Sequence, residues 1–270
     1  MKANFLKKLY DADNETVEYI MEHFLPVKEA AGKLVSMGIT KENADEFFTG
    51  GGVPFDPFLM EGMKEAVELI GKKVYDGQDI LIYGDYDADG VSAAAILKLF
   101  FDEEDIPCRV RLPSRDEGYG IHYETVKREY EKKAFGLVVT VDCGISGKDE
   151  IRRIREELGI DVIVTDHHEI PRELPDCICV NPKMGYPFPY LSGSGVALKL
   201  AEAMSDADRA FMYADLAAVG IIGDLMPLLS ENRMIVRQAL AKTGNAGLAQ
   251  LCRYAGVRGR VTVSDYGMKL

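Results

Sequence analysis

The pattern of apolar and polar residues divides the chain into a central part and two flanking parts. In the centre, five short runs rich in Val and Ile alternate with amphipathic stretches of helical length. The runs cover residues 80–83, 108–112, 137–141, 161–165 and 177–181. Strands that alternate with helices predict a parallel β-sheet with helices on both faces. The third and fourth runs, LVVTV and DVIVT, are almost free of polar residues, as strands buried on both faces should be. We therefore predict an α/β fold built on a five-stranded parallel sheet.

Helices are expected in the part before the sheet. The stretch DPFLMEGMKEAVELI offers Asp56 as an N-cap and Pro57 at the first helical position. Its apolar residues then recur at helical spacing, at Met60, Met63, Val67 and Ile70. A second helix is predicted in TKENADEFF, capped by Thr40, and the turn-rich FTGGGVPFDP is a linker between the two.

The part after the sheet also predicts helices. GVALKLAEAM and DRAFMYADLAAVGII fit helices, and DLMPLLSENRMIVRQAL fits a Pro-bounded turn followed by another helix. The tail RVTVSDYGMKL is expected to be extended. We predict three parts: a helical segment, residues 1–75, packed on the core; an α/β core, 76–204; and a helical extension, 205–270, that completes the functional site.

Composition limits the function classes. The chain has 270 residues, of which 47% are hydrophobic, and a formal net charge of -12. Bulk charge therefore does not attract nucleic acid, and a polyanion would have to bind through local Arg and Lys or through cations. The five cysteines fit no disulfide framework or zinc spacing, which predicts free thiols in a reducing compartment. No apolar run spans a membrane and the N-terminus lacks a signal-peptide core, so we expect a cytoplasmic protein without membrane contact.

Polar side chains follow four of the predicted strands. Asp85, Asp87 and Asp89 follow the first, Asp142 follows the third, Asp166, His167 and His168 follow the fourth, and Asn181 ends the fifth. An Asp after a strand is commonly a turn former or helix cap. In open α/β sheets, however, ligands bind beyond the carboxyl ends of the strands. The coincidence at four strand ends predicts a functional site at this edge.

The residue types at these strand ends indicate a metal centre. Carboxylates with imidazoles and no thiolate suit Mn²⁺ or Mg²⁺. Such a set can hold two ions about 3.5–4 Å apart, which clamp a phosphate and activate a water. The segment DYDADG also resembles the start of an EF-hand calcium loop, but Ile96 stands where the closing Glu is required. The segment also follows a strand, whereas an EF-hand loop lies between helices.

Four motifs together resemble those of the DHH phosphoesterase superfamily: YGDYDADGVSAAAIL, VTVDCGIS, VTDHHE and VNPKMGYPFPYLSGSGVALKL. Within it the chain is most similar to the RecJ exonucleases, through DPFLMEGM, RLPSRDEGYG and GDLMPLLSENR. The resemblance implies a metal-dependent phosphodiesterase that hydrolyses single-stranded DNA from 5′ to 3′ in DNA repair and recombination, using two Mn²⁺ or Mg²⁺ ions. It also implies that a DNA-binding domain follows the helical extension, with single-stranded-DNA-binding proteins or helicases as further partners.

The resemblance also assigns roles to residues. It implies that Asp87, Asp89, His167 and Asp224 are metal ligands and that Asp142 bridges both ions. Asp142, Asp166 and His168 form the catalytic set, in which His168 contacts the scissile phosphate or helps the leaving group. Asp85 supports the ligands without binding the metal itself. Tyr83 stands where many relatives carry a His ligand.

Further residues are candidates for substrate binding, each with a plainer alternative. Ser192, Gly193, Ser194 and Gly195 precede a helix, either as a phosphate cradle or as an ordinary helix start. Arg111 and Arg115 pair either with the DNA backbone or with surface carboxylates, and Asn181 completes the set. Tyr119 either stacks on a base or only packs.

Two other functions remain open. The first is a phosphoesterase of the same superfamily that acts on oligoribonucleotides, cyclic dinucleotides or pyrophosphate. The second is a binding scaffold that has lost catalysis. RLPSRDEGYG and LSENR argue against the first of these. The complete set of carboxylates argues against the second.

Overall fold

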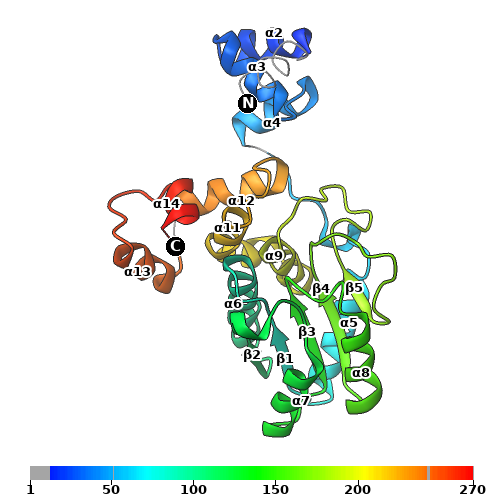
Figure 1. The fold of residues 1–270 in the computed structure, drawn as a ribbon. Coiled ribbons are helices and arrows are strands. Elements are labelled where there is room, and N and C mark those ends of the chain that lie inside the picture. Colours follow the sequence, from blue (N-terminus) through cyan, green and yellow to red (C-terminus); the bar gives the residue numbers. More distant parts are fainter. Residues whose placement is uncertain (1–12, 51, 242–243, 270) are drawn as a thin grey trace. The chain divides into compact units, whose positions relative to one another are not determined.

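The computed structural model describes residues 13–50, 52–241 and 244–269, and the chain forms two compact units, Met1–Val53 and Pro54–Leu270 (Figure 1). The boundary falls inside the predicted linker FTGGGVPFDP. The predicted division at residues 75 and 204 stays a prediction. Residues 1–12, on which the expected lack of a signal-peptide core depends, lie outside the described residues. Within the described ranges, no helix combines the length and the apolar character needed to cross a membrane.

The described part of the first unit is helical. It contains α2 (Asn14–His23), α3 (Lys28–Ser36) and α4 (Lys41–Thr49). As predicted, α4 is capped by Thr40, whose backbone N–H donates to Oδ1 of Asn43 over 2.8 Å. The aromatic rings of Phe24 and Phe48 stack with their centroids 4.4 Å apart. This unit therefore has its own small apolar core.

The second unit is built on the predicted parallel sheet. Its strands are β1 (Ile80–Tyr83), β2 (Cys108–Arg111), β3 (Leu137–Val141), β4 (Asp161–Thr165) and β5 (Ile178–Val180). All neighbouring strands are parallel, and their order is β2-β1-β3-β4-β5. The chain leaves β1 for one edge of the sheet and then returns to β3 on the other side. The strand order therefore reverses between the neighbouring strands β1 and β3, and ligands bind such sheets at this switch point.

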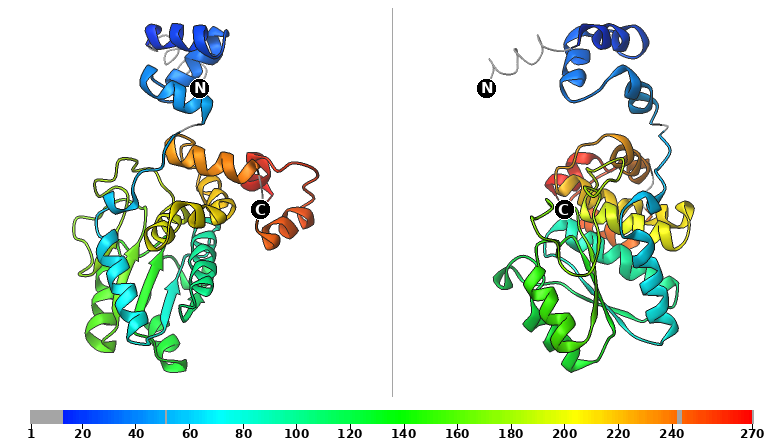
Figure 2. Two further views of the ribbon diagram at one scale, coloured as in Figure 1. Left: turned by 180° about the vertical axis from the view of Figure 1, so that it is seen from behind. Right: turned by 90° about the vertical axis from the view of Figure 1, so that its right-hand side faces the viewer.

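Helices cover both faces of the sheet, as predicted (Figure 2). Side chains alternate along each strand, so that Ile82 and Val139 enter one apolar core while Leu81 and Val138 enter the other. The helices on the first face are α5 (Met63–Tyr75), α6 (Ala88–Glu103) and α9 (Gly193–Met204). Those on the second face are α7 (Tyr123–Lys132) and α8 (Lys148–Leu158).

The chain after α9 forms a helical layer. Its elements are α10 (Ala207–Ala210), the 3₁₀ turn η3 (Phe211–Tyr213), α11 (Ala214–Gly223), α12 (Ser230–Ala241), α13 (Ala246–Tyr254) and α14 (Val263–Met268). The apolar α11 packs against α6, α9 and α12. Since α11 ends at the carboxyl edge of the sheet, it brings the residue that follows it, Asp224, to the predicted site.

Two sequence predictions about local structure are wrong. The tail is not extended, because Thr262 and Asp265 form a capping box that starts α14. The helix expected from Asp56 is not continuous either. Asp56 caps the short 3₁₀ turn η1 (Pro57–Leu59), and α5 begins only after Gly62. Gly62 has φ +78°, and a Cβ there would lie 2.4 Å from the carbonyl oxygen of Cys179. The close approach to β5 forces the chain to turn at that point.

Candidate metal centre

The loop after β1 supplies three carboxylates to the edge of the sheet. Asp85 is buried, and its Oδ1 accepts the N–H of Tyr86 over 2.7 Å. Asp87 caps α6, because its Oδ1 accepts the N–H of Gly90 over 2.9 Å. A Cβ on Gly90 would lie 2.7 Å from backbone atoms of Asp85, so only glycine allows this tight turn. Asp89, in the first turn of α6, is also buried.

The carboxylate of Asp89 is held by the start of α9. The N–H groups of Gly193 and Ser194 donate to its two oxygens over 2.5 and 2.9 Å. Free N–H groups and the helix dipole make a helix start a natural anion site. The Oγ of Ser192 accepts the N–H of Gly195 over 3.3 Å, as a helix cap does. Residues Ser192–Gly195 thus form a capped helix start that holds the side chain of Asp89, and their role as a phosphate cradle stays a prediction.

Asp142 lies at the centre of the site, directly after β3. Its φ is +59°, a strained conformation for a residue other than glycine. The side chain is 1% exposed, and Oδ1 has no hydrogen-bond partner among the described residues. Burial and the nearby carboxylates of Asp89 and Asp87 raise the pKa of Asp142 to about 12. The side chain is therefore placed where a bound cation would favour its ionised form.

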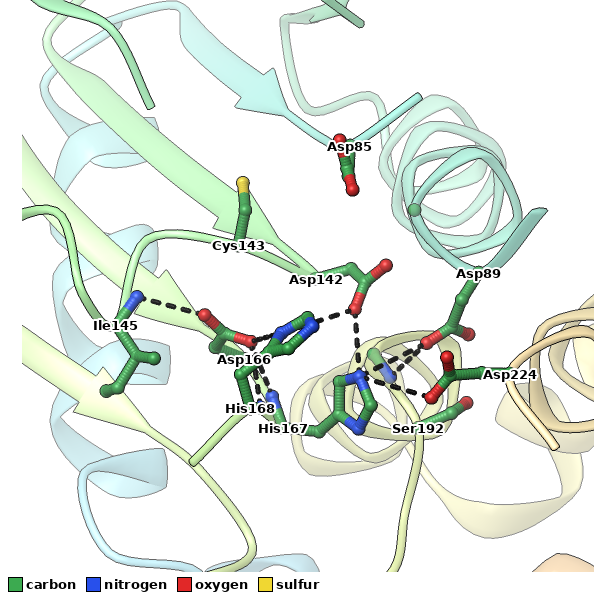
Figure 3. A network of polar contacts seen from close by, with 12 residues as sticks. Asp85, Asp89, Asp142, Cys143, Ile145, Asp166, His167, His168, Ser192 and Asp224 are labelled. Atoms are coloured by element: carbon green, nitrogen blue, oxygen red, sulfur yellow. Dashed lines mark hydrogen bonds and ion pairs between the residues drawn. The ribbon is translucent and has the colours of Figure 1, made fainter. Parts of the chain in front are cut away.

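His167 connects Asp142 to two further carboxylates (Figure 3). Its Nε2 lies 3.1 Å from Oδ1 of Asp142, 3.6 Å from Oδ2 of Asp224 and 3.8 Å from Oδ2 of Asp89. Burial lowers the pKa of His167 and raises that of Asp224. A neutral imidazole offers a lone pair, which is the form that binds metals.

The candidate ligand atoms form three overlapping groups, each within 4.8 Å. The groups are Asp89–His167–Asp224, Asp85–Asp87–Asp142 and Asp142–His167–His168. The donors are carboxylate oxygens and imidazole nitrogens without thiolate, and the buried Oδ1 of Asp142 has no hydrogen-bond partner among the described residues. The residues present therefore fit a centre for hard divalent cations. Asp85, for which the sequence suggested only a supporting role, lies among these atoms.

Asp166 orients His168. The buried carboxylate accepts the N–H groups of Ile145, His167 and His168 over 2.9, 2.7 and 3.1 Å, and lies 2.7 Å from Nδ1 of His168. Burial acts to raise the pKa of Asp166, but the bonds from His168 and the backbone lower it overall. The same contact raises the pKa of His168. Asp166 thus acts through His168, whereas His168 itself is partly exposed at the site.

Tyr119 also contacts His168, which the sequence did not indicate. Its hydroxyl lies 3.0 Å from Nδ1 of His168, and the two rings meet edge to face. The ring remains 42% exposed. No spacing rule connects positions 119 and 168, which come together only because the loop before α7 returns to the carboxyl edge of the sheet.

Of the remaining substrate-binding candidates, Asn181 and Arg111 have partners within the protein, whereas Arg115 is exposed. Asn181 is buried and holds the loop, because its Nδ2 donates to the His168 carbonyl over 3.0 Å and its Oδ1 accepts the Lys183 N–H over 2.9 Å. Arg111 pairs with Glu117 over 2.6 Å. Arg115, in the 3₁₀ turn η2 (Arg115–Glu117), is exposed beside the ring of Tyr86. Of the two arginines, Arg115 is therefore better placed to meet a substrate.

Tyr83 does not replace the expected histidine as a ligand. Its side chain is buried, and its hydroxyl donates to the carbonyl of Gly120 over 3.3 Å. Burial raises the pKa of this phenol well above its usual value. Asp85 follows Tyr83 by two residues and is the carboxylate nearest to it in sequence. Its ligand atom and those of Asp87 and Asp142 lie within 4.8 Å of one another.

Residues 79–221 match the family model described as the DHH family, N-terminal domain. The chain belongs to the DHH family. The matched DHH region contains all the candidate ligands except Asp224, which follows it by three residues. The end of α11 thus brings Asp224, a candidate ligand already named from the sequence, to the site from outside the matched region.

Curated relatives of this DHH chain are described as single-stranded-DNA-specific exonuclease RecJ. The protein from Bacillus subtilis is 39% identical over 254 residues, which cover 90% of this chain and 32% of the relative. The protein from Thermus thermophilus is 36% identical over 212 residues, which cover 74% and 31%. The chain therefore spans about a third of the length of these relatives.

Solved structures of RecJ share the fold. A Thermus thermophilus RecJ in complex with Mn²⁺ has a TM-score of 0.76 at 30% identity, covering 95% of this chain and 38% of that one. An exonuclease RecJ bound to manganese has a TM-score of 0.71 at 34% identity, covering 80% and 57%.

Proposed function

We propose that this chain is the catalytic core of a metal-dependent phosphodiesterase that releases nucleotides from single-stranded DNA in the 5′ to 3′ direction. The observation that carries the proposal is the convergence of carboxylates and imidazoles from three strand ends and from the end of α11 around Asp142. The similarity to RecJ exonucleases supports the substrate class, and the polarity is proposed from the family resemblance of the motifs.

The proposed cofactors are two Mn²⁺ or Mg²⁺ ions, in keeping with the manganese and magnesium complexes of RecJ. Asp89, His167 and Asp224 would hold one ion, and Asp87 with Asp85 the other. Asp142 belongs to the group with Asp85 and Asp87, and its Oδ1 lies 3.1 Å from Nε2 of His167 in the other group, so we propose that it bridges the two ions. When bound, the ions neutralise these carboxylates, polarise a phosphate and lower the pKa of a bound water. An acidic chain can in this way accept a polyanion.

His168 is proposed to serve the leaving group. Asp166 and Tyr119 occupy the Nδ1 side of the ring, so Nε2 is the nitrogen available to the substrate. The raised pKa of His168 favours a protonated ring, which can donate a proton from Nε2 to the departing oxygen. Arg115 at the rim would contact the DNA backbone, and the exposed ring of Tyr119 lies where a base can stack.

We infer the wider context from the same relatives. A role in repair and recombination, a DNA-binding domain that continues the protein, single-stranded-DNA-binding proteins or helicases as partners, and a cytoplasmic location are proposals that accompany the exonuclease function. The N–H groups of Gly193 and Ser194 already bind Asp89. We therefore propose that the main contacts with the DNA backbone come from Arg115 and from the proposed DNA-binding domain.

The test is nucleotide release from 5′-labelled single-stranded DNA in the presence of Mn²⁺. Wild type and Asp142→Asn are compared on single-stranded DNA, duplex DNA, an oligoribonucleotide and a cyclic dinucleotide. The proposal expects release from single-stranded DNA by the wild type, and a loss of at least about a hundredfold in the variant. Preference for the oligoribonucleotide or the cyclic dinucleotide would overturn the substrate assignment. Equal release by both proteins would overturn the site.

A further inference from the structure

A buried amide on α12 links the two segments that place the metal-binding carboxylates. Asn232 is 0% exposed, and its Nδ2 donates to the carbonyl of Tyr190 over 2.7 Å and to the carbonyl of Pro227 over 3.1 Å. Two carbonyls face one atom of the side chain, so that atom must be the donor nitrogen. The Oδ1 atom has no hydrogen-bond partner among the described residues. The amide is therefore engaged only through its two donated hydrogen bonds.

One of the two carbonyls belongs to the segment that carries Asp224. Pro227 lies three residues after Asp224, in the turn that leads from α11 to α12. Within this turn Leu225 has φ +55° and is 89% exposed. Met226, Leu228 and Leu229 of the same turn pack against the apolar core, so the strain and exposure are confined to the residue next to Asp224. The bond from Asn232 to Pro227 is a fixed point just beyond the carboxylate.

The other carbonyl belongs to the segment that leads into α9. Tyr190 lies two residues before Ser192, which caps that helix. The next two N–H groups, of Gly193 and Ser194, hold the carboxylate of Asp89. The position of Tyr190 therefore fixes the anchor of Asp89, in the same way that Pro227 fixes the turn after Asp224.

The helix that carries Asn232 is itself tied to α9. Glu231, the preceding residue, pairs with the buried Lys199 of α9 over 3.1 Å and accepts the N–H of Phe55 over 3.1 Å. In addition, α12 packs along α11 (Figure 1). The helix that carries the amide of Asn232 is thus anchored to both α9 and α11.

We propose that Asn232 is a positioning residue for the cation bound by Asp89, His167 and Asp224, and that its two hydrogen bonds set the separation of the two carboxylates. The Nε2 atom of His167 lies 3.8 Å from Asp89 and 3.6 Å from Asp224, so a small displacement of either loop spoils the group. This inference rests on the proposed function of the site. In this proposal α12 supplies no metal ligand and acts by positioning the segments that place Asp89 and Asp224.

The decisive comparison is Mn²⁺ affinity, measured by calorimetric titration of wild type, Asn232→Asp and Gln238→Ala. Asn232→Asp keeps the shape of the side chain but removes both donors. Gln238→Ala removes an exposed amide from the same helix. Loss of a group that orients metal ligands typically weakens metal binding by about 10–100-fold, and this is the result expected for Asn232→Asp alone. Melting curves without metal show that each variant is folded.

A second variant covers the case in which a buried carboxylate prevents folding. Asn232→Ala removes both donors without adding a charge, and the same weakening is expected. If the folded variant binds Mn²⁺ within about twofold of the wild type, the bonds of Asn232 serve stability alone and the inference is overturned, while the proposed function stands. If the wild type binds no Mn²⁺, the metal centre itself is overturned, and the inference with it.

Discussion

Gly193 lies directly against Asp142. A Cβ atom at position 193 would be 2.4 Å from the Cβ of Asp142 and 2.5 Å from its Oδ1. Real side chains do not approach so closely, so any residue other than glycine would displace either the start of α9 or the central carboxylate. The glycine is therefore explained by the site and not by the turn, since its own conformation is that of an ordinary helical residue.

Gly193→Ala is predicted to weaken the metal centre. The methyl group would push on Asp142 and on the N–H groups that hold Asp89, and we expect Mn²⁺ affinity to fall by about 10–100-fold. The matched control is Gly71→Ala, an exposed helical glycine of α5 with no atoms within 4 Å of a new Cβ. This control should be stabilised by roughly 0.5–1 kcal/mol and bind Mn²⁺ normally. Normal Mn²⁺ binding by Gly193→Ala would contradict the packing argument.

Lys199→Met is predicted to destabilise the second unit. Lys199 and Glu231 are each 2% exposed and pair with each other. Removal of the lysine leaves a buried carboxylate without its cation, which costs about 3–5 kcal/mol. Denaturant unfolding would measure the loss, and Lys199→Met combined with Glu231→Gln should recover part of it.

The control for this pair is Lys98→Met. Lys98 pairs with Asp102 on the exposed side of α6, one helical turn away. Such pairs contribute about 0.2–0.5 kcal/mol, so little change is expected. Equal losses in Lys98→Met and Lys199→Met would show that burial does not determine the cost.

The contact between Glu117 and Arg111 is predicted to make stability depend on pH in the acid range. The N–H of Ser114, followed by Arg111, lowers the pKa of Glu117 from 4.5 to about 2. A carboxyl with a lowered folded-state pKa stabilises the fold above its unfolded value. The contribution should be complete above about pH 4.5 and lost as the pH falls toward 2, by roughly 1 kcal/mol after solvent screening.

Unfolding curves of wild type and Glu117→Gln between pH 2 and pH 6 would test this. The two proteins should converge at low pH, where the wild-type carboxyl is protonated, and diverge as the pH rises. Glu131→Gln, an exposed position of α7, serves as the control. A constant difference between wild type and Glu117→Gln across the range would contradict the assignment.

The sequence predicted most of the sheet and the position of the site. The strands lie where runs of Val and Ile stand, since strands buried on both faces need such runs. Asp142 and His167 were predicted as partners because both follow parallel strands, and the carboxyl ends of parallel strands lie at one edge. The tail was predicted wrongly because alternation of Val and Thr outweighed the capping box at Thr262 and Asp265.

Other features of the site depend on contacts that no spacing shows. Tyr119 meets His168 across 49 positions, and Asn232 meets Tyr190 across 42. The sequence predicts an anion at the helix start Ser192–Gly195, and the fold brings the carboxylate of Asp89 there from 104 positions away. A helix start predicts that an anion is bound, while only the fold decides which one.

The central claim is that Asp142 joins two cation sites, and the most direct test is the number of Mn²⁺ ions bound by wild type and by Asp142→Asn. Electron paramagnetic resonance during a Mn²⁺ titration reports both the number of bound ions and whether two of them are magnetically coupled. The account predicts two coupled ions in the wild type, and in folded Asp142→Asn at most one ion with the coupling lost. Two coupled ions in both proteins, or none in the wild type, would contradict it.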